Sequence, residues 1–305
     1  MGDVTKIEWA DRTFNPWEGC QKVGPGCDNC YAETRNARWN GGEATNWGPG
    51  APRRRTSAAN WRKPLQWDRE QAAAKAERPN SHTPIPPVFV FCASLADVFD
   101  NAVPVPWRRD LFDLIQRTPN LTWLLLTKRP GNVIAMAKAL AEEDLGRYAD
   151  DLGVRSWWPR NAALGCTVVN QEEADRDVPK LLDAKARLNP AFAFLSMEPL
   201  LGPVDLRQIT LRRDGQLPSA LSNRMGDYIL PLRGALRDSP VLDWLIVGGE
   251  SGPNARPMDL AWPRDLLQQT EGTGVVFNFK QVGGKGANKG GHELDGQTYF
   301  GRPSI

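Results

Sequence analysis

The chain has 305 residues, 41% of them hydrophobic and 24% charged, and it balances 38 lysines and arginines against 36 aspartates and glutamates. This near neutrality argues against a histone-like protein that coats a polyanion, and the sequence contains no apolar run of about 20 residues that would span a membrane. Residues 1–14 contain acidic residues and lack the apolar core of a signal peptide, so we expect a cytoplasmic protein.

Three of the five cysteines, Cys20, Cys27 and Cys30, form a C-x6-C-x2-C segment that also contains glycine and proline. Such a segment can wrap so that three thiolates converge on one centre. An iron–sulfur cluster such as [4Fe–4S] takes cysteine ligands, and three of them would leave one iron free. A structural zinc normally has four protein ligands. For zinc, the candidates for the fourth ligand are Asp28, His82 and His292.

A basic, aromatic segment follows the cysteines. Residues 51–63 contain five cations and no acid, and six of the twelve tryptophans precede residue 68. Cations pair with phosphates and aromatic rings stack on bases, so Arg53, Arg54 and Arg55 are candidate contacts to a single strand or a flipped nucleotide. The alternative is a solvated charged loop whose tryptophans pack over the rest of the fold.

From residue 85 onward, short apolar runs alternate with helical stretches, as in βαβ units. Their near-continuous apolarity is typical of parallel strands that are buried on both faces. The predicted strands are Val88–Cys92, Leu121–Thr127, Ala162–Val169, Ala191–Ser196, Leu242–Val247 and Val275–Phe279. The predicted helices are Pro106–Arg117, Gly131–Ala141, Gln171–Asn189 and Ala261–Glu271.

We therefore predict an α/β fold, a partial or complete TIM-like βα barrel of about six to seven parallel strands. The barrel would span residues 85–305, with an irregular insertion at about 203–240. Residues 1–84 would form a cysteine-, tryptophan- and arginine-rich segment packed on it. Cys92 and Cys166 stand alone in apolar runs and are predicted to be core residues.

Polar side chains follow nearly every predicted strand. In parallel α/β folds, ligands bind outside the carboxyl ends of the strands, so these side chains are expected to line one pocket. Acids and lysines occur there in similar numbers, which favours a polar pocket with compensating charges. The residues at these positions are Ser94, Asp97, Thr127, Lys128, Arg129, Thr167, Asn170, Ser196, Glu198, Glu250, Ser251, Lys280 and Gln281.

Several segments resemble the phage-associated three-cysteine proteins, a family whose substrate is unassigned. The resemblance covers most of the chain and rests on KIEWAD (6–11), FNPWEGC (14–20), GCDNCYA (26–32), LLLTKRP (124–130), SMEPLLG (196–202), WLIVGGESG (244–252) and FKQVGG (279–284). That family in turn resembles the radical S-adenosylmethionine enzymes, which hold a [4Fe–4S] cluster through three cysteines at the top of a partial βα barrel. Compared with the usual C-x3-C-x2-C motif, the first spacing here is longer, and Asn29 stands where an aromatic residue usually precedes the third cysteine.

The resemblance implies that Cys20, Cys27 and Cys30 ligate the cluster. S-adenosylmethionine would bind the free iron and be cleaved to a 5′-deoxyadenosyl radical that attacks a substrate, which we expect to be a nucleic acid base. Such an enzyme would also need an electron donor. Lys128 and Lys280 are expected near the substrate, and the expected cofactor contacts are Ser94, Asn170, Ser196, Glu198 and Glu250. The alternative is a zinc-stapled module that binds or processes nucleic acid without redox chemistry.

Overall fold

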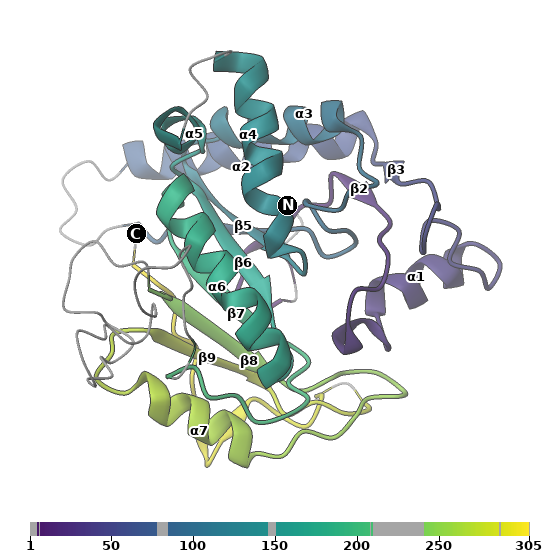
Figure 1. Ribbon diagram of the computed structural model, residues 1–305, viewed down its shortest axis with the longest axis vertical. Coiled ribbons are helices and arrows are strands. Elements are labelled where there is room, and N and C mark those ends of the chain that lie inside the picture. The colour runs from purple at the N-terminus through teal and green to yellow at the C-terminus, as the bar shows by residue number, and fades with distance from the viewer. Residues whose placement is uncertain are drawn as a thin grey trace.

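The computed structural model describes residues 5, 7–77, 85–145, 151–207, 209, 241–286 and 288–304. Its central element is one seven-stranded sheet in the order β1-β4-β5-β6-β7-β8-β9, and all neighbouring strands in it are parallel. The sheet is curved (Figure 1). Within the described residues its two edge strands do not pair with each other, so it forms an open half-barrel instead of a closed barrel. The predicted partial βα barrel is therefore confirmed.

The elements alternate along the chain as predicted. The sheet consists of β1 (Arg12–Thr13), β4 (Val88–Cys92), β5 (Leu121–Thr127), β6 (Ala162–Thr167), β7 (Ala193–Met197), β8 (Trp244–Gly248) and β9 (Val276–Gln281). The helices are α1 (Tyr31–Trp39), α2 (Ala58–Ala76), α3 (Val105–Gln116), α4 (Pro130–Leu145), α5 (Asp151–Trp157), α6 (Gln171–Leu188) and α7 (Ala261–Thr270). Two small pairs add β2 (Trp17–Glu18) with β3 (Arg54–Arg55), and β10 (Glu293–Leu294) with β11 (Gln297–Thr298).

All six predicted strands and all four predicted helices are present, with ends that differ by a few residues. The sequence did not indicate β1, α1, α2 or α5. β1 has only two residues, and α2 contains Pro64 in its interior, a residue that usually interrupts a helix. Because β1 pairs with β4, the segment before residue 85 contributes a strand to the sheet besides packing on it. The insertion predicted at about 203–240 lies largely outside the described residues.

The outer face of the sheet and the helices enclose the larger apolar core. Alternate residues of each strand point outward, so Val90 and Cys92 of β4 pack in this core while Phe89 and Phe91 point inward. Cys166 also lies in the outer core and is fully buried, so both isolated cysteines are core residues as predicted. In the described part of the chain, no helix combines the length and apolarity that crossing a membrane requires.

The inner face of the half-barrel changes from apolar to polar along the strands. Near the strand starts it carries a mainly aromatic cluster that includes Trp9, Phe89, Phe192, Phe194 and Trp244. The ring of Phe194 lies so close to β6 that a Cβ added at Gly165 would be 2.3 Å from it. This aromatic cluster fills the lower half of the interior and leaves room only toward the carboxyl ends of the strands.

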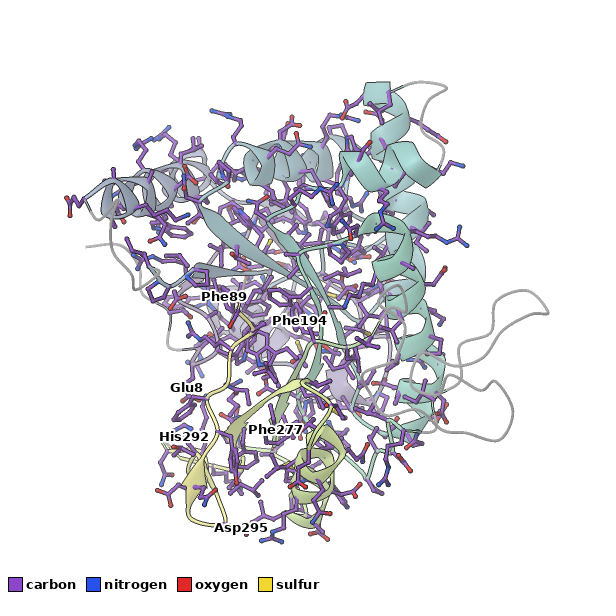
Figure 2. All side chains as sticks on the ribbon, turned by 90° about the vertical axis from the view of Figure 1, so that its left-hand side faces the viewer. Glu8, Phe89, Phe194, Phe277, His292 and Asp295 are labelled. Atoms are coloured by element: carbon purple, nitrogen blue, oxygen red, sulfur yellow. The ribbon has the colours of Figure 1, made fainter. Side chains whose placement is uncertain are left out.

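The two ends of the described chain meet across the open side of the half-barrel. Arg302 forms an ion pair with Asp11 at 3.0 Å and lies over the ring of Phe89. Nδ1 of His292 lies 3.3 Å from Glu8, and Figure 2 shows these two residues side by side. These contacts hold the first residues of the chain against its last residues and close the base of the aromatic cluster.

Gly165→Ala is expected to lower the free energy of unfolding by about 1–3 kcal/mol, because the new methyl group overlaps the buried Phe194 ring. Urea denaturation followed by circular dichroism measures this change. Gly131→Ala in the first turn of α4 is the control, since the nearest atom to its Cβ is 3.6 Å away, and it should leave stability unchanged or raise it slightly. Equal effects of the two substitutions would contradict this account of the inner face.

Candidate active site at the carboxyl ends of the strands

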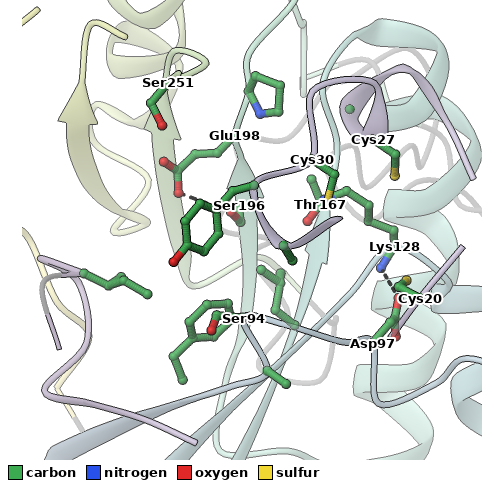
Figure 3. Close-up of a pocket in the computed structure, with 18 of the residues that line it drawn as sticks. Cys20, Cys27, Cys30, Ser94, Asp97, Lys128, Thr167, Ser196, Glu198 and Ser251 are labelled. Atoms are coloured by element: carbon green, nitrogen blue, oxygen red, sulfur yellow. Dashed lines mark hydrogen bonds between the residues drawn. The ribbon is translucent and has the colours of Figure 1, made fainter. Parts of the chain in front are cut away.

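A cavity of about 680 Å³ opens at the carboxyl ends of the strands. Its volume lies within the usual range of small-molecule sites. Cys20, Cys27 and Cys30 all line it, and Figure 3 shows them with Lys128 toward one end and Glu198 and Ser251 toward the other. The other polar residues that line the cavity include Ser94, Asp97, Thr167, Ser196, Glu250 and Lys280. The structure therefore brings the three-cysteine segment and most of the predicted strand-end residues to one place.

The cysteine segment, residues 20–30, crosses the mouth of the half-barrel between β2 and α1. Gly19 directly precedes the segment. Its φ of +118° favours glycine, and a Cβ added there would lie 2.6 Å from the carbonyl oxygen of Asn46. A short 3-10 turn over Pro25–Cys27 places Cys27, and Cys30 is the residue just before the first turn of α1. Each cysteine is thus held at a defined point of the backbone.

Arg129 holds the first end of the cysteine segment. Its guanidinium forms a buried ion pair with Asp97 at 2.9 Å, donates to the carbonyl of Gln21 at 2.8 Å and lies 3.5 Å from Sγ of Cys20. Asp97 in turn accepts from the hydroxyl of Thr127 at 2.7 Å. Cys20 is therefore tied to the end of β5 by a charged side chain.

Arg256 holds the other end of the segment. Its guanidinium pairs with Glu250 at 2.6 Å and donates to the carbonyl of Pro25 at 2.9 Å, and it also pairs with Asp28 at 3.2 Å. Glu250 additionally accepts from the side-chain amide of Asn29 at 2.9 Å. We call the Arg129–Asp97 and Arg256–Glu250 pairs the two loop anchors, because they hold the cysteine segment from opposite sides of the cavity.

The surroundings of the site shift the pKa values of Cys20 and Glu250. Burial and the nearby Asp97 carboxylate raise the pKa of Cys20 to about 11, although Arg129 acts in the opposite direction. Burial also raises the pKa of Glu250, but hydrogen bonds from Arg256 and Asn29 outweigh it, so the net pKa lies below the ordinary glutamate value. The Glu250 anchor is consequently intact at neutral pH and weakens only as the pH falls through that lowered value.

A row of polar groups lies on the inner face beyond the cysteines. Lys280 on β9 pairs with Glu198 at 2.7 Å, and the hydroxyl of Ser196 lies 3.5 Å from the same carboxylate. Thr167 at the end of β6 is 2% exposed, and its hydroxyl has no hydrogen-bond partner among the described residues. A buried hydroxyl without a partner is costly, so this one is available to a polar ligand in the cavity.

Asn170 and Glu250, two of the predicted cofactor contacts, have structural roles. Asn170 does not line the cavity: its side chain caps α6 by accepting from the backbone N–H of Glu173 at 2.9 Å. Glu250 lines the cavity, but both its oxygens already accept hydrogen bonds from the loop anchor. The remaining predicted cofactor contacts, Ser94, Ser196 and Glu198, also line the cavity. The Ser94 hydroxyl accepts from the side-chain amide of Asn15 at 3.0 Å, and Glu198 pairs with Lys280 as described above.

The three predicted nucleic-acid arginines all have acidic partners. Arg53 is buried and pairs with Asp100 at 2.7 Å, and Arg54 pairs with Glu18. Arg55 pairs with Asp110 at 2.6 Å and lies over the ring of Trp61. The buried guanidinium of Arg53 thus holds the chain around residues 46–53 and is not placed to contact phosphate, whereas Arg54 and Arg55 remain exposed.

The residues considered as a fourth zinc ligand also have other contacts. His292 lies against Glu8 and the carbonyl of Lys280, and Asp28 faces Arg256. His82 lies outside the described residues. Among the residues that the structure describes, no three His, Cys, Asp or Glu side chains are grouped as for a single metal ion, and this includes Cys20, Cys27 and Cys30.

Sequence reasoning placed Arg129 and Thr167 among the polar strand ends without giving them a specific role, and it missed Arg256 and Asn29 as contributors to the site. Arg129 and Thr167 follow or end predicted strands, so their positions alone were a usable signal. Arg256 lies in a loop, and its contact with a segment about 230 residues earlier leaves no local pattern. Asn29, which departs from the usual motif, serves here as a donor to Glu250.

Comparison with known proteins gives one match. The sequence model of a family described as "Protein of unknown function (DUF5131)" matches residues 4–303. No curated protein and no solved structure shows significant similarity to the chain.

Arg256→Gln is expected to release the second end of the cysteine segment, because it removes the charged hydrogen bonds to Glu250, Asp28 and Pro25. Hydrogen bonds to charged groups contribute about 1.5–3 kcal/mol each, so hydrogen exchange across residues 20–31 should accelerate about 10-fold or more. The matched control is Arg264→Gln, which breaks an exposed ion pair with Asp295 and should leave this segment unchanged. Unchanged exchange in the first variant would refute the anchor.

Proposed function

We propose that this chain, which belongs to the DUF5131 family of proteins of unknown function, is an enzyme of the radical S-adenosylmethionine type. The resemblance to phage-associated three-cysteine proteins and to radical enzymes is part of this proposal. The observation that carries it is that Cys20, Cys27 and Cys30 line the same cavity as the polar strand ends of the half-barrel. A cluster held by three thiolates would thus lie directly beside a binding site for its ligand.

The donor set of the cavity fits such a group. Of the residues that the structure describes, three cysteines and no histidine line the cavity, and iron–sulfur clusters take cysteine ligands. Burial and Asp97 raise the pKa of the Cys20 thiol, and Arg129, 3.5 Å from its sulfur, offsets only part of that rise, so binding of the metal itself would have to drive deprotonation. The unpartnered hydroxyl of Thr167 lines the same cavity and is available to a polar ligand.

When bound, the cluster would supply the electron that cleaves S-adenosylmethionine and yields a radical able to abstract hydrogen. The protein's own residues would hold and orient the reactants. The two loop anchors fix the cysteine segment, and Ser94, Thr167 and Ser196 offer hydroxyls to ribose or amino acid groups. The aromatic cluster below the cavity keeps water out of the interior.

From its sequence position Lys280 is expected near the substrate, but it pairs with Glu198 at 2.7 Å, so we assign both residues to the charged end of S-adenosylmethionine. That part of the molecule carries an ammonium and a carboxylate, and the pair offers one group of each opposite sign, 2.7 Å apart. Lys128, at the cysteine end of the cavity, would lie nearer the substrate. We infer a nucleic acid base as that substrate, together with an external electron donor.

The alternative, a zinc-stapled nucleic-acid module, needs a fourth ligand. His292 and Asp28 are engaged with Glu8 and Arg256, so either would have to leave that partner to complete a zinc site. Metal analysis of the purified protein separates the two, because the proposal expects iron and sulfide and the alternative expects zinc.

Anaerobic reconstitution tests the cluster. The wild-type protein should bind about four iron and four sulfide per chain and turn brown. Cys20→Ser, Cys27→Ser and Cys30→Ser should each lose most of the visible absorbance. Cys92→Ala, which changes a buried core residue, should load iron like the wild type. Failure of the wild type to load iron, or full loading of all three cavity variants, would refute the proposal.

Glu198→Gln is expected to weaken binding of S-adenosylmethionine to the reconstituted protein about 10-fold, because it removes one charged hydrogen-bonding group from the cavity. Isothermal titration calorimetry measures the affinity. Asn170→Ala is the control: it should cost about 1 kcal/mol of stability through loss of the α6 cap but leave the affinity unchanged. The opposite result, weaker binding only in the Asn170 variant, would show that the cofactor lies elsewhere.

A further inference from the structure

One face of α1 remains outside the proposed chemistry and has an unusual composition. Tyr31 is 67% exposed and Trp39 is 75% exposed, and both are among the large hydrophobic residues that the described structure leaves exposed. Figure 1 shows α1 at the edge of the molecule, away from the helices that cover the sheet. Isolated exposed apolar residues are common on protein surfaces. Whether these two rings mark a binding surface therefore depends on the residues around them.

The neighbours of the two rings are arginines. With 3.6 residues per turn, Tyr31, Arg35 and Arg38 lie in one stripe along the helix, and Trp39 lies beside its end. Arg38 is exposed, and the side chain of Arg35 is 39% exposed. The one acid of α1, Glu33, points away from this stripe and pairs with Lys22 at 3.8 Å.

A third arginine extends the positive charge of this face. Glu18, only 4% exposed, pairs with both Arg35 and Arg54, so two guanidiniums share one carboxylate and one positive charge remains uncompensated. The side chain of Arg54 is 66% exposed and lies on β3 beside α1. We call Tyr31, Arg35, Arg38, Trp39 and Arg54 the α1 face.

The α1 face leads to the cavity. Tyr31 is at once a lining residue of the cavity and strongly exposed, so it lies at the cavity mouth. Trp39 lies about 12 Å farther along the helix axis. The α1 face therefore extends outward from the mouth of the cavity that the three cysteines line, with an exposed ring at each end and arginines between them.

We propose that the α1 face binds single-stranded nucleic acid and guides it to the cavity. Phosphates would pair with Arg35, Arg38 and Arg54, and unpaired bases would stack on Trp39 and Tyr31, which is how sequence-tolerant single-strand sites are built. This placement differs from the arginine run of residues 53–55, where Arg53 is buried. Binding itself needs no cluster, although the fate of the strand rests on the proposed function.

The test is fluorescence anisotropy with a labelled mixed-sequence oligonucleotide of about 20 nucleotides, as single-stranded DNA, as RNA and as DNA duplex. Wild-type protein should prefer the single strands, and its affinity should fall steeply between about 50 and 200 mM salt. Trp39→Ala should weaken binding about 5- to 100-fold, and Trp39→Phe should retain most of it. Arg38→Gln should reduce the salt slope by about 1.

Two matched controls accompany these variants. Arg69→Gln removes an exposed arginine of α2, and Phe300→Ala removes a half-exposed ring beside β9, at the other edge of the sheet. Both should bind like the wild type. Absence of saturable binding at low salt, equal affinity for duplex, or full affinity in Trp39→Ala would overturn the proposal. A wild-type dimer that Trp39→Ala converts to monomer would also overturn it and assign the face to self-association.

All binding measurements use protein without iron, and parallel samples are reconstituted for iron and sulfide analysis. The outcomes of the two proposals are therefore separate. A protein that binds oligonucleotide through Trp39 but loads no iron supports the α1 face and refutes the proposed radical chemistry. A protein that loads iron but does not bind oligonucleotide refutes the α1 face and leaves the proposed radical chemistry supported.

Discussion

A parallel sheet brings the carboxyl ends of all its strands to one edge, and the site of this protein depends on that constraint. Each strand alternates inward and outward residues, so the inner face can change from apolar to polar between one inward residue and the next. In β7 the sequence of inward positions is Phe194 and then Ser196, with Glu198 just beyond the strand. Together with its neighbours, β7 forms an interior that is mainly aromatic at its base and polar at its mouth.

The cysteine segment precedes most of the sheet in sequence and lies across its mouth, so it needs contacts that bridge long stretches of chain. The two loop anchors provide them. Each consists of an arginine and a carboxylate from the strand-end loops, and each arginine also donates to a backbone carbonyl of the segment. Because both carboxylates are buried, losing either arginine leaves a charge without its partner, which makes the arrangement specific as well as stable.

The same geometry links the interior chemistry with the outside surface. Cys30 precedes α1 directly, so the helix that begins at the cavity extends away from it. A residue such as Tyr31 can therefore line the cavity and face solvent at once. A substrate guided along α1 would reach the reactive centre without crossing the aromatic cluster below.

The sequence by itself determined the six long strands, the four helices between them and the grouping of polar strand ends, because apolar periodicity is a local property of the chain. It also singled out Cys20, Cys27 and Cys30. The Asn170 cap is also a local feature, since Asn170 directly precedes a predicted helix and accepts from Glu173 three residues later. Only the tertiary structure decided that Arg53 is buried and that Arg256 reaches the cysteine segment. These outcomes depend on which distant side chains meet, and a hydrogen bond between residues more than 200 positions apart leaves no trace in local sequence.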